Sequence, residues 1–150
     1  MEEQKEVKVK KKRKGKGCLI ALLIVVVILL ISGGIGWAYV GREHREARSL
    51  PLNAVDFSRL NDGVWHGAYA GGMYQWRYNE CDVTITNGKV VDINLTAAQN
   101  LDVLRDGAEM QYERVISDQS LQVDTISGST LTGKGYLQCV ENALIPAMHN

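Results

Sequence analysis

The fold of this chain is decided by the stretch Val83-Thr84-Ile85-Thr86-Asn87-Gly88-Lys89-Val90-Val91-Asp92-Ile93, which lies in the C-terminal half of its 150 residues. Asn-Gly is the strongest short-range hairpin signal, because both residues adopt the positive φ angles of a two-residue turn at little cost. Residues 82–86 before it are rich in β-branched side chains, and the apolar residues at positions 91, 93 and 95 after it alternate as in a half-buried strand. The stretch therefore predicts two antiparallel strands joined by a tight turn.

Further strands and helices are predicted around this hairpin. Residues 61–63 are a turn signal, and residues 64–69 after them have the composition of a strand, as do residues 74–78. Helices are predicted over residues 108–116 and 135–144, because apolar residues recur there at helical spacing. Their shared faces consist of Ala108, Tyr112, Val115 and Ile116 in the first helix and of Tyr136, Cys139, Val140 and Ala143 in the second. Strands followed by helices indicate an α+β fold, with a small antiparallel sheet and packed helices.

The first forty residues have the pattern of a membrane anchor. Residues 18–40 carry no charged side chain, and at the helical rise these 23 residues span roughly 30 Å, the thickness of the hydrocarbon core of a bilayer. Residues 8–16 before them are almost entirely basic, so the positive-inside rule places the N-terminus in the cytoplasm and the C-terminal part outside. We therefore expect a single-pass protein of the cell membrane, with a basic cytoplasmic tail (1–17), a transmembrane helix (18–40), a connector (41–55) and an extracytoplasmic folded domain (56–150).

A cleaved signal peptide is the alternative interpretation of the same residues, and it would place the domain in the same compartment. The apolar stretch exceeds the roughly 7–15 residues that are usual in a signal peptide, which favours the anchor. The basic residues beside it are explained by topology and by attraction to anionic lipids of the bilayer.

Charge argues against a nucleic-acid partner. Of the 17 basic and 17 acidic residues, residues 1–40 hold eight and three, which leaves nine and 14 for the remainder, a net charge of about −5. No Ser-His-Asp ordering or pair of carboxylates supports a hydrolase, and no Cys/His cluster has the spacing of a metal site. Cys81 and Cys139 would share one compartment, where they either form a disulfide or act as two small buried apolar residues.

The segment from Asp124 to Thr132 has a composition suited to a phosphate group. It holds one carboxylate, one glycine and five hydroxyl groups, directly before the last predicted helix. The N-terminus of a helix presents free N–H groups to an anion, and Gly128 lets the backbone turn closely around a bound group. The alternative is an ordinary helix cap, in which Thr130 or Thr132 accepts a hydrogen bond from the first turn.

The same segment resembles the flavinylation motif D-x-x-S-G-A-T-x-T/S of the FMN-binding domain family, which includes the extracytoplasmic flavin subunits of the Rnf complex and of the sodium-pumping NADH:quinone reductase. Residues 62–67 are similar to the opening D-G-x-Y-x-G of the family, and residues 83–93 resemble its central strand–turn–strand. Residues 116–124 and 140–144 resemble its lead-in and its closing helix, so the resemblance covers roughly residues 56–147. Ser129 stands where the family usually has alanine, and Trp65 where tyrosine is commoner.

The resemblance implies that FMN is attached by a phosphoester to the hydroxyl of Thr130. A separate flavin transferase makes this bond, with FAD as donor and a divalent metal, so the chain is the substrate of that reaction and not its catalyst. Trp65, Tyr69 and Trp76 are candidates to flank the flavin ring, and of these we favour Trp65; the alternative for each is ordinary packing in the core or on a strand face. The acceptor loop is expected to shape the phosphate end. The expected cofactor-binding residues are Thr130, Asp124, Ser127, Gly128, Ser129, Thr132 and Trp65.

The function implied by the resemblance is electron transfer by a membrane-anchored flavoprotein domain. Its partners would be the flavin transferase, a membrane redox protein and the lipid bilayer, with no nucleic acid. The alternative is a sensor or scaffold beside a membrane redox complex, which holds FMN non-covalently or holds no flavin.

Overall fold

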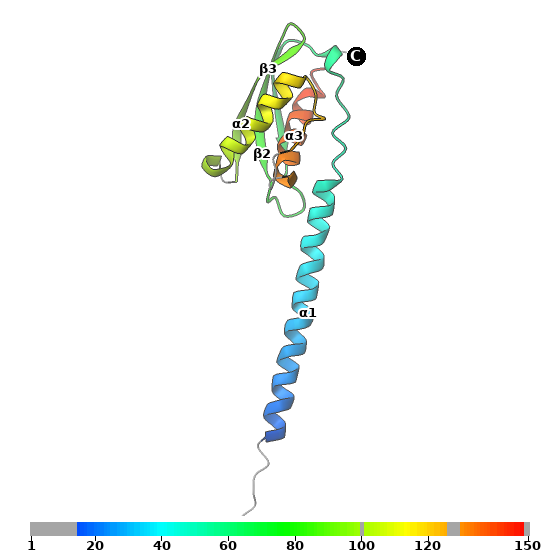
Figure 1. Cartoon of the computed structure of the whole chain (residues 1–150), viewed down its shortest axis with the longest axis vertical. Helices are drawn as coiled ribbons and strands as arrows, with labels where there is room; N and C mark the ends of the chain where they lie inside the picture. The colour runs from blue at the N-terminus through cyan, green and yellow to red at the C-terminus, as the bar shows by residue number, and fades with distance from the viewer. Residues whose placement is uncertain (1–14, 100, 126–129, 149–150) are drawn as a thin grey trace, which may run out of the picture. The chain divides into compact units, whose positions relative to one another are not determined.

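A computed structural model describes residues 15–99, 101–125 and 130–148 of the chain (Figure 1). Its helices are α1 (Gly15–Arg48), the 3-10 helix η1 (Phe57–Arg59), α2 (Leu101–Asp118) and α3 (Thr130–Leu144). Its strands are β1 (Gly63–Tyr69), β2 (Asn79–Thr86) and β3 (Lys89–Ala98). The predicted α+β fold, preceded by one apolar helix, is confirmed. The chain divides into two compact units, of which the first ends at Tyr39 and the second begins at Val40.

Helix α1 contains the apolar stretch predicted from residues 18–40. By length and composition it could cross a membrane. A helix is the element expected for such a stretch, because backbone groups in lipid must be paired within the segment itself. The helix continues to Arg48, and its last turns belong to the second unit, where Glu43 and Ala47 are buried. Part of the predicted connector (41–55) is therefore packed against the folded domain.

The second unit is built on a three-stranded antiparallel sheet in the order β1-β2-β3. The φ angles of Asn87 (54°) and Gly88 (67°) are those of the predicted two-residue turn, so the hairpin of β2 and β3 is confirmed. Asp62, just before β1, accepts hydrogen bonds from the backbone N–H groups of Asn87 at 2.9 Å and Gly88 at 2.7 Å. These bonds tie the hairpin turn to the start of β1.

The predicted buried face of β3 is wrong at one residue. Val91 is 48% exposed, whereas its neighbour Val90 is 1% exposed. The register shifts at this place, because Thr84 pairs with Asp92 while the next residue of β2, Ile85, pairs with Val90. A bulge of this kind inserts one extra residue into β3 and so reverses which side chains point inward.

Residues 74–78 do not form the strand that their composition predicted. They belong to a loop of turns between β1 and β2, in which Gly71 and Gly72 have φ angles of 88° and 82°. An added Cβ at Gly71 would lie 2.2 Å from the backbone nitrogen of Tyr78. The chain folds back on itself here at a distance that leaves no space for a side chain.

Both long helices of the second unit pack on one face of the sheet, α2 against β3 and α3 against β1 and β2 (Figure 1). Strand β2 accordingly alternates between buried and more exposed residues. The predicted helix faces are confirmed, because Ile116 packs on the core and the other members of both faces are buried. The sheet contributes to the same core with Cys81, Val83, Ile85, Val90, Ile93 and Leu95.

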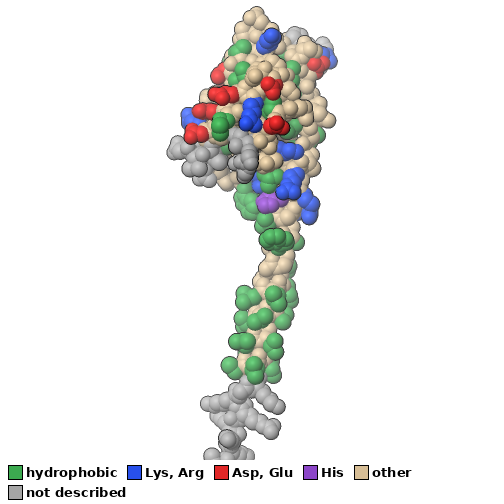
Figure 2. All heavy atoms as spheres, in the orientation of Figure 1, with side chains coloured by type: hydrophobic (Ala, Val, Ile, Leu, Met, Phe, Trp, Pro, Cys, Tyr) green, Lys and Arg blue, Asp and Glu red, His purple; other side chains and the backbone are tan. Residues whose placement is uncertain are grey.

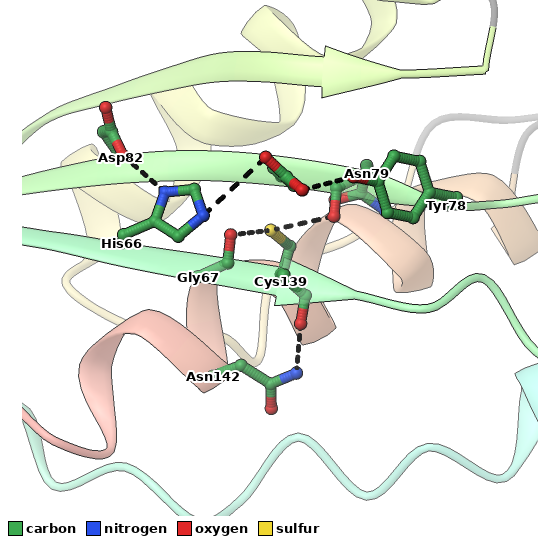
Figure 3. Close-up of polar contacts among 9 residues, drawn as sticks. His66, Gly67, Tyr78, Asn79, Asp82, Cys139 and Asn142 are labelled. Carbon is green, nitrogen blue, oxygen red and sulfur yellow. Dashed lines mark hydrogen bonds and ion pairs between the residues drawn. The ribbon is translucent and has the colours of Figure 1, made fainter.

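Helix α3 packs closely on β1 at Gly67. An added Cβ there would lie 2.2 Å from the carbonyl oxygen of Cys139, so a side chain at this position would force the two elements apart. The Cys139 thiol donates to the carbonyl of Gly67 at 3.3 Å, and the Asn142 amide donates to the carbonyl of Ala68 at 2.8 Å (Figure 3). These contacts fix the position of α3, and with it the position of its first residue, Thr130.

Candidate functional site

Thr130, the expected acceptor of FMN, is the first residue of α3, and its side chain is exposed. The first turn of a helix has N–H groups without intrahelical partners, and the positive end of the helix dipole lies there. An exposed hydroxyl at this place is accessible to a modifying enzyme, and a phosphate attached to it would be stabilised. Thr132 is half-buried in the same turn. Ser127, Gly128 and Ser129 lie outside the described residues.

Asp124 is held by α2 through its backbone. Its carbonyl oxygen accepts hydrogen bonds from the amide of Gln111 at 3.4 Å and from the guanidinium of Arg114. Its carboxylate side chain is exposed. Helix α2 therefore fixes the path of the chain that leads to Thr130, and it brings a positive charge to this segment.

Gln111 of α2 is fully buried and carries a polar atom without a partner. Its Oε1 accepts no hydrogen bond from any described residue. The same oxygen lies against the first turn of α3, since an added Cβ at Gly133 would be 3.3 Å from it. A buried unpaired acceptor costs about 1–3 kcal/mol, so a hydrogen-bond donor that reached this oxygen would be stabilised there.

A surface pocket of about 260 Å³ adjoins the segment before Thr130. Residues 50–52 and 121–125 line it, together with Lys134 and Leu137 of α3. The ammonium group of Lys134 donates to the carbonyl oxygen of Arg48 at 2.6 Å. Lys134 thus places a second positive charge one helical turn from Thr130, which suits a bound anion.

Trp65, the expected aromatic neighbour of the flavin, lies near the opposite end of α3. Its indole nitrogen donates to the carbonyl of Asn61 at 3.2 Å, and the Asn61 N–H donates to the carbonyl of Ala147, beyond the last residue of α3. The 15 residues of α3 span about 22 Å at the rise of an α-helix. The structure therefore does not bring Trp65 close to Thr130, and its contact with flavin stays a prediction.

Tyr69 is the aromatic residue of β1 that lies near the start of α3. An added Cβ at Gly135 would be 3.4 Å from its ring, so the ring packs on the backbone of the helix's second turn. Burial, together with the negative charges of Glu43 and Glu46, raises the pKa of Tyr69. Its phenol is therefore protonated at neutral pH, and it is available as a hydrogen-bond donor.

His66 lies on the uncovered face of the sheet. Its Nδ1 is 2.8 Å from Oδ1 of Asp82, and its Nε2 is 3.7 Å from Oε2 of Glu80 (Figure 3). The next residue, Gly67, faces α3, and successive side chains of a strand point to opposite faces. His66 therefore points away from the helix that carries Thr130.

Residues 78–145 match the family model of the FMN-binding domain. No curated protein matches the chain. This part of the chain is therefore an FMN-binding domain, and the cofactor that the family implies is FMN. The match runs from just before β2 to just after α3, and it includes the whole segment from Asp124 to Thr132. Residues 62–67, which also resemble the family, lie outside the match.

The residues around Thr130 fit the chemistry of FMN. The phosphate suits the N-terminus of α3 with the cations of Lys134 and Arg114 nearby. The ribityl chain carries hydroxyl donors, which suit the unpaired oxygen of Gln111, and Tyr69 offers an aromatic ring at the same end of the helix. When bound, FMN supplies redox chemistry that the side chains themselves lack.

Sequence reasoning missed Gln111, Arg114 and Lys134. A signal for Gln111 was present, because this amide stands among Ala108, Tyr112 and Val115 on the apolar face of α2. A polar residue on such a face is buried with the apolar ones and requires a partner. Arg114 and Lys134 carry no comparable signal, since charged residues on exposed helix positions are common.

Proposed function

We propose that the chain is a membrane-anchored, extracytoplasmic electron-transfer domain that carries FMN covalently on Thr130. The observation that carries this proposal is the exposed Thr130 hydroxyl at the first residue of α3, inside the stretch that matches the FMN-binding domain. The flavinylation motif that residues 124–132 resemble has its acceptor threonine at this position.

Attachment of FMN requires an external catalyst in this proposal. The Oγ atom of Thr130 attacks the phosphorus of the FMN half of FAD, the bond to the AMP phosphate breaks, and AMP leaves. A base of the flavin transferase takes up the hydroxyl proton, because a threonine hydroxyl is a weak nucleophile without such help. The products are the phosphoester on Thr130 and AMP, with no change of oxidation state.

The residues around Thr130 would then hold the phosphate end while the flavin ring stays free for redox chemistry. The helix dipole of α3 and the charge of Lys134 offset the negative charge of the phosphoester. The covalent bond prevents loss of the cofactor outside the cytoplasm, where free FMN is not replaced. Electron donor and acceptor would be redox proteins of the same membrane.

Helix α1 supplies the membrane attachment in this proposal. The basic residues 8–16 precede it, and the part of the chain after residue 40 is acidic, with a net charge of about −5. The positive-inside rule then places the FMN-binding domain on the outer side. Protease added to intact spheroplasts should therefore digest the domain, whereas a domain that survives until the cells are lysed would overturn the orientation.

Intact mass after acid denaturation tests the covalent site directly. The full chain is purified from cells that co-express a flavin transferase, and we expect an added mass of one FMN minus one water. Thr130→Ala should abolish this addition. Thr125→Val is the matched control, because Thr125 is half-buried in the same segment and is not the acceptor position of the motif.

The outcomes separate three functions. Acid-resistant FMN on the Thr130→Ala chain would overturn the site assignment. Yellow protein that loses its colour on denaturation would indicate non-covalent FMN. Colourless protein of unmodified mass would favour the flavin-free sensor or scaffold, with Thr130 acting as part of a helix cap.

A further inference from the structure

The loop between β1 and β2 carries exposed apolar side chains close together in sequence. In this loop, residues 70–78, which we call the aromatic loop, Met73 is 42% exposed and Trp76 is 46% exposed. Tyr74 stacks on Trp76, with ring centroids 5.0 Å apart and an angle of 28° between the ring planes. A thioether and two amphipathic rings thus share one short surface loop.

The aromatic loop is held in a defined shape by its own backbone. The N–H of Gln75 donates to the carbonyl of Gly72 at 3.1 Å, and the N–H of Arg77 donates to the carbonyl of Gly71 at 3.3 Å. The N–H of Tyr78 donates in turn to the carbonyl of Gln75 at 3.2 Å. Met73 and Trp76 are therefore exposed because an ordered turn holds them outward.

Glu43 ties the aromatic loop to the last turns of α1. Its carboxylate accepts hydrogen bonds from the N–H of Met73 at 3.0 Å and from the guanidinium of Arg77 at 2.9 Å. Both charged side chains are almost completely shielded from solvent. The contact is close, since an added Cβ at Gly72 would lie 2.4 Å from Oε1 of Glu43. All of these residues belong to the second unit.

In the sequence, Glu43 lies just beyond the apolar stretch. Trp37 and Tyr39 have the aromatic side chains that mark the membrane–water interface of a spanning helix. Glu43 follows Tyr39 by only four residues, so the length of the chain keeps the two within about 14 Å of each other. The chain length alone therefore keeps the residue that holds the aromatic loop close to the end of the predicted membrane span (18–40).

The last turns of α1 also carry positive charge. Three arginines, Arg42, Arg45 and Arg48, are exposed there beside one exposed carboxylate, Glu46. The negative charge of Glu43 is paired with Arg77, which leaves these turns with a positive excess. Figure 2 shows Lys and Arg side chains gathered around this part of the chain. Arginine and amphipathic aromatic side chains together suit the headgroup layer of a bilayer, where the rings enter the interface and the cations meet lipid phosphates.

We propose that the aromatic loop docks on the surface of the bilayer, with Met73, Tyr74 and Trp76 in the headgroup layer. The proposal rests on the membrane anchor of the proposed function, because only an inserted α1 brings Glu43 and the loop to a lipid surface. Docking would fix the orientation of the FMN-binding domain on the membrane, so that a redox partner meets it from a defined side.

The chain's three tryptophans permit a direct test with the full-length, flavin-free chain. Replacing two of them with phenylalanine at a time leaves Trp37, Trp65 or Trp76 as the single fluorophore. Each variant is reconstituted in phosphatidylcholine vesicles that contain a lipid with a nitroxide quencher on its headgroup. Trp37 reports the anchor and Trp76 the aromatic loop. Trp65 is the matched control, because it belongs to the same domain but not to the aromatic loop; its indole N–H donates a hydrogen bond to the carbonyl of Asn61, just before β1.

We expect the fluorescence loss of Trp76 to be comparable to that of Trp37, with little loss for Trp65. If Trp37 is quenched but Trp76 is quenched no more than Trp65, the docking is overturned and the anchor stays intact. Absence of quenching at all three residues would overturn the anchor and the docking together. Equal quenching of Trp65 and Trp76 would indicate non-specific adsorption of the domain and would also reject the proposal.

A second measurement covers the case in which Trp65→Phe prevents folding. The fluorescence intensity is then compared between Trp37→Phe and the double variant Trp37→Phe/Trp76→Phe, with and without the quencher lipid. The difference between these two chains reports Trp76 alone, while Trp65 stays in place. A difference that does not decrease when the quencher lipid is added contradicts the docking.

Discussion

The side-chain amide of Gln119 pairs with both backbone groups of Val90. Its Oε1 accepts a hydrogen bond from the Val90 N–H at 3.0 Å, and its Nε2 donates to the Val90 carbonyl at 2.8 Å. The same Nε2 donates to the carbonyl of Ile116 at 2.7 Å, so one side chain connects the end of α2 to the start of β3. Gln119 stands in the lead-in stretch that resembles the FMN-binding family, and the contact gives this glutamine a structural role.

Gln119→Ala should destabilise the second unit. The change leaves the N–H and carbonyl of buried Val90 without these partners, and we expect the free energy of unfolding to fall by about 1–3 kcal/mol. Urea unfolding of the chain in detergent measures the difference. Gln75→Ala is the matched control, because Gln75 is exposed and shares the positive φ angle, 57° against 46°. Equal losses in the two variants would contradict the role of the amide.

Asp62 should make the stability of the hairpin depend on pH. Hydrogen bonds from the N–H groups of Gly88 and Asn87 lower the pKa of Asp62 from its usual value. A carboxyl group with a lowered pKa stabilises the fold above its unfolded pKa, and this contribution is lost as the pH falls through the folded pKa. Asp62→Ala should therefore lower Tm at neutral pH, and the difference from the unmodified chain should shrink below about pH 4.

The control for this pH dependence is Asp92→Ala, which removes an exposed carboxylate of β3. It should leave Tm and its pH dependence close to those of the unmodified chain. A Tm difference for Asp62→Ala that stays constant from neutral pH to pH values well below 4 would show that the lost bonds do not depend on ionisation.

The parts of the fold that could be predicted from sequence are those determined by residues adjacent to one another in the chain. Asn87 and Gly88 adopt the two positive φ angles of the turn by themselves, and this local preference sets the pairing of β2 with β3. The sequence did not predict that the side chain of Val91 points away from the core, because the bulge depends on how β2 and β3 pair after the turn. The periodicity of either strand alone contains no signal for it.

The candidate site could be predicted only for the part of it that a single continuous segment of the chain forms. The position of Thr130 follows from the motif, but the aromatic side chain beside it does not. Trp65 and Tyr69 are four residues apart and so point to the same face of β1. Which of them lies near Thr130 depends on the direction in which α3 crosses this strand, and that is a property of the packed domain. The contact of Gln111 with the first turn of α3 arises in the same way.

Cys81 and Cys139 should behave as unreactive free thiols. Both are buried and unpaired in the structure, which supports the second of the two interpretations open from the sequence. The hydrogen bond with Cys139, followed by burial, raises the pKa of Cys81, so the reactive thiolate is disfavoured. In detergent, a maleimide should label only the exposed Cys18 of the native chain, and mass spectrometry counts the labels.

Unfolding without a reductant separates the two interpretations of this pair. Three labels are expected per unfolded chain when the thiols are free, and one label when Cys81 and Cys139 form a disulfide. Cys18→Ser provides the control, since it should give no label in the native chain and two after unfolding. One label on the unfolded, unreduced chain would reject the free-thiol state.

Gly67→Ala should destabilise the packing of α3 on β1. The added methyl group would lie 2.2 Å from the carbonyl oxygen of Cys139 and 2.8 Å from the Cβ of Ala143, so strand and helix must separate. We expect a loss of about 1–3 kcal/mol in the free energy of unfolding. Gly107→Ala in α2 is the matched control: its Cβ meets no atom within 4 Å, and alanine should stabilise the helix by about 0.5–1 kcal/mol. If Gly67→Ala unfolds at the same urea concentration as the unmodified chain, the close approach of α3 to β1 is wrong.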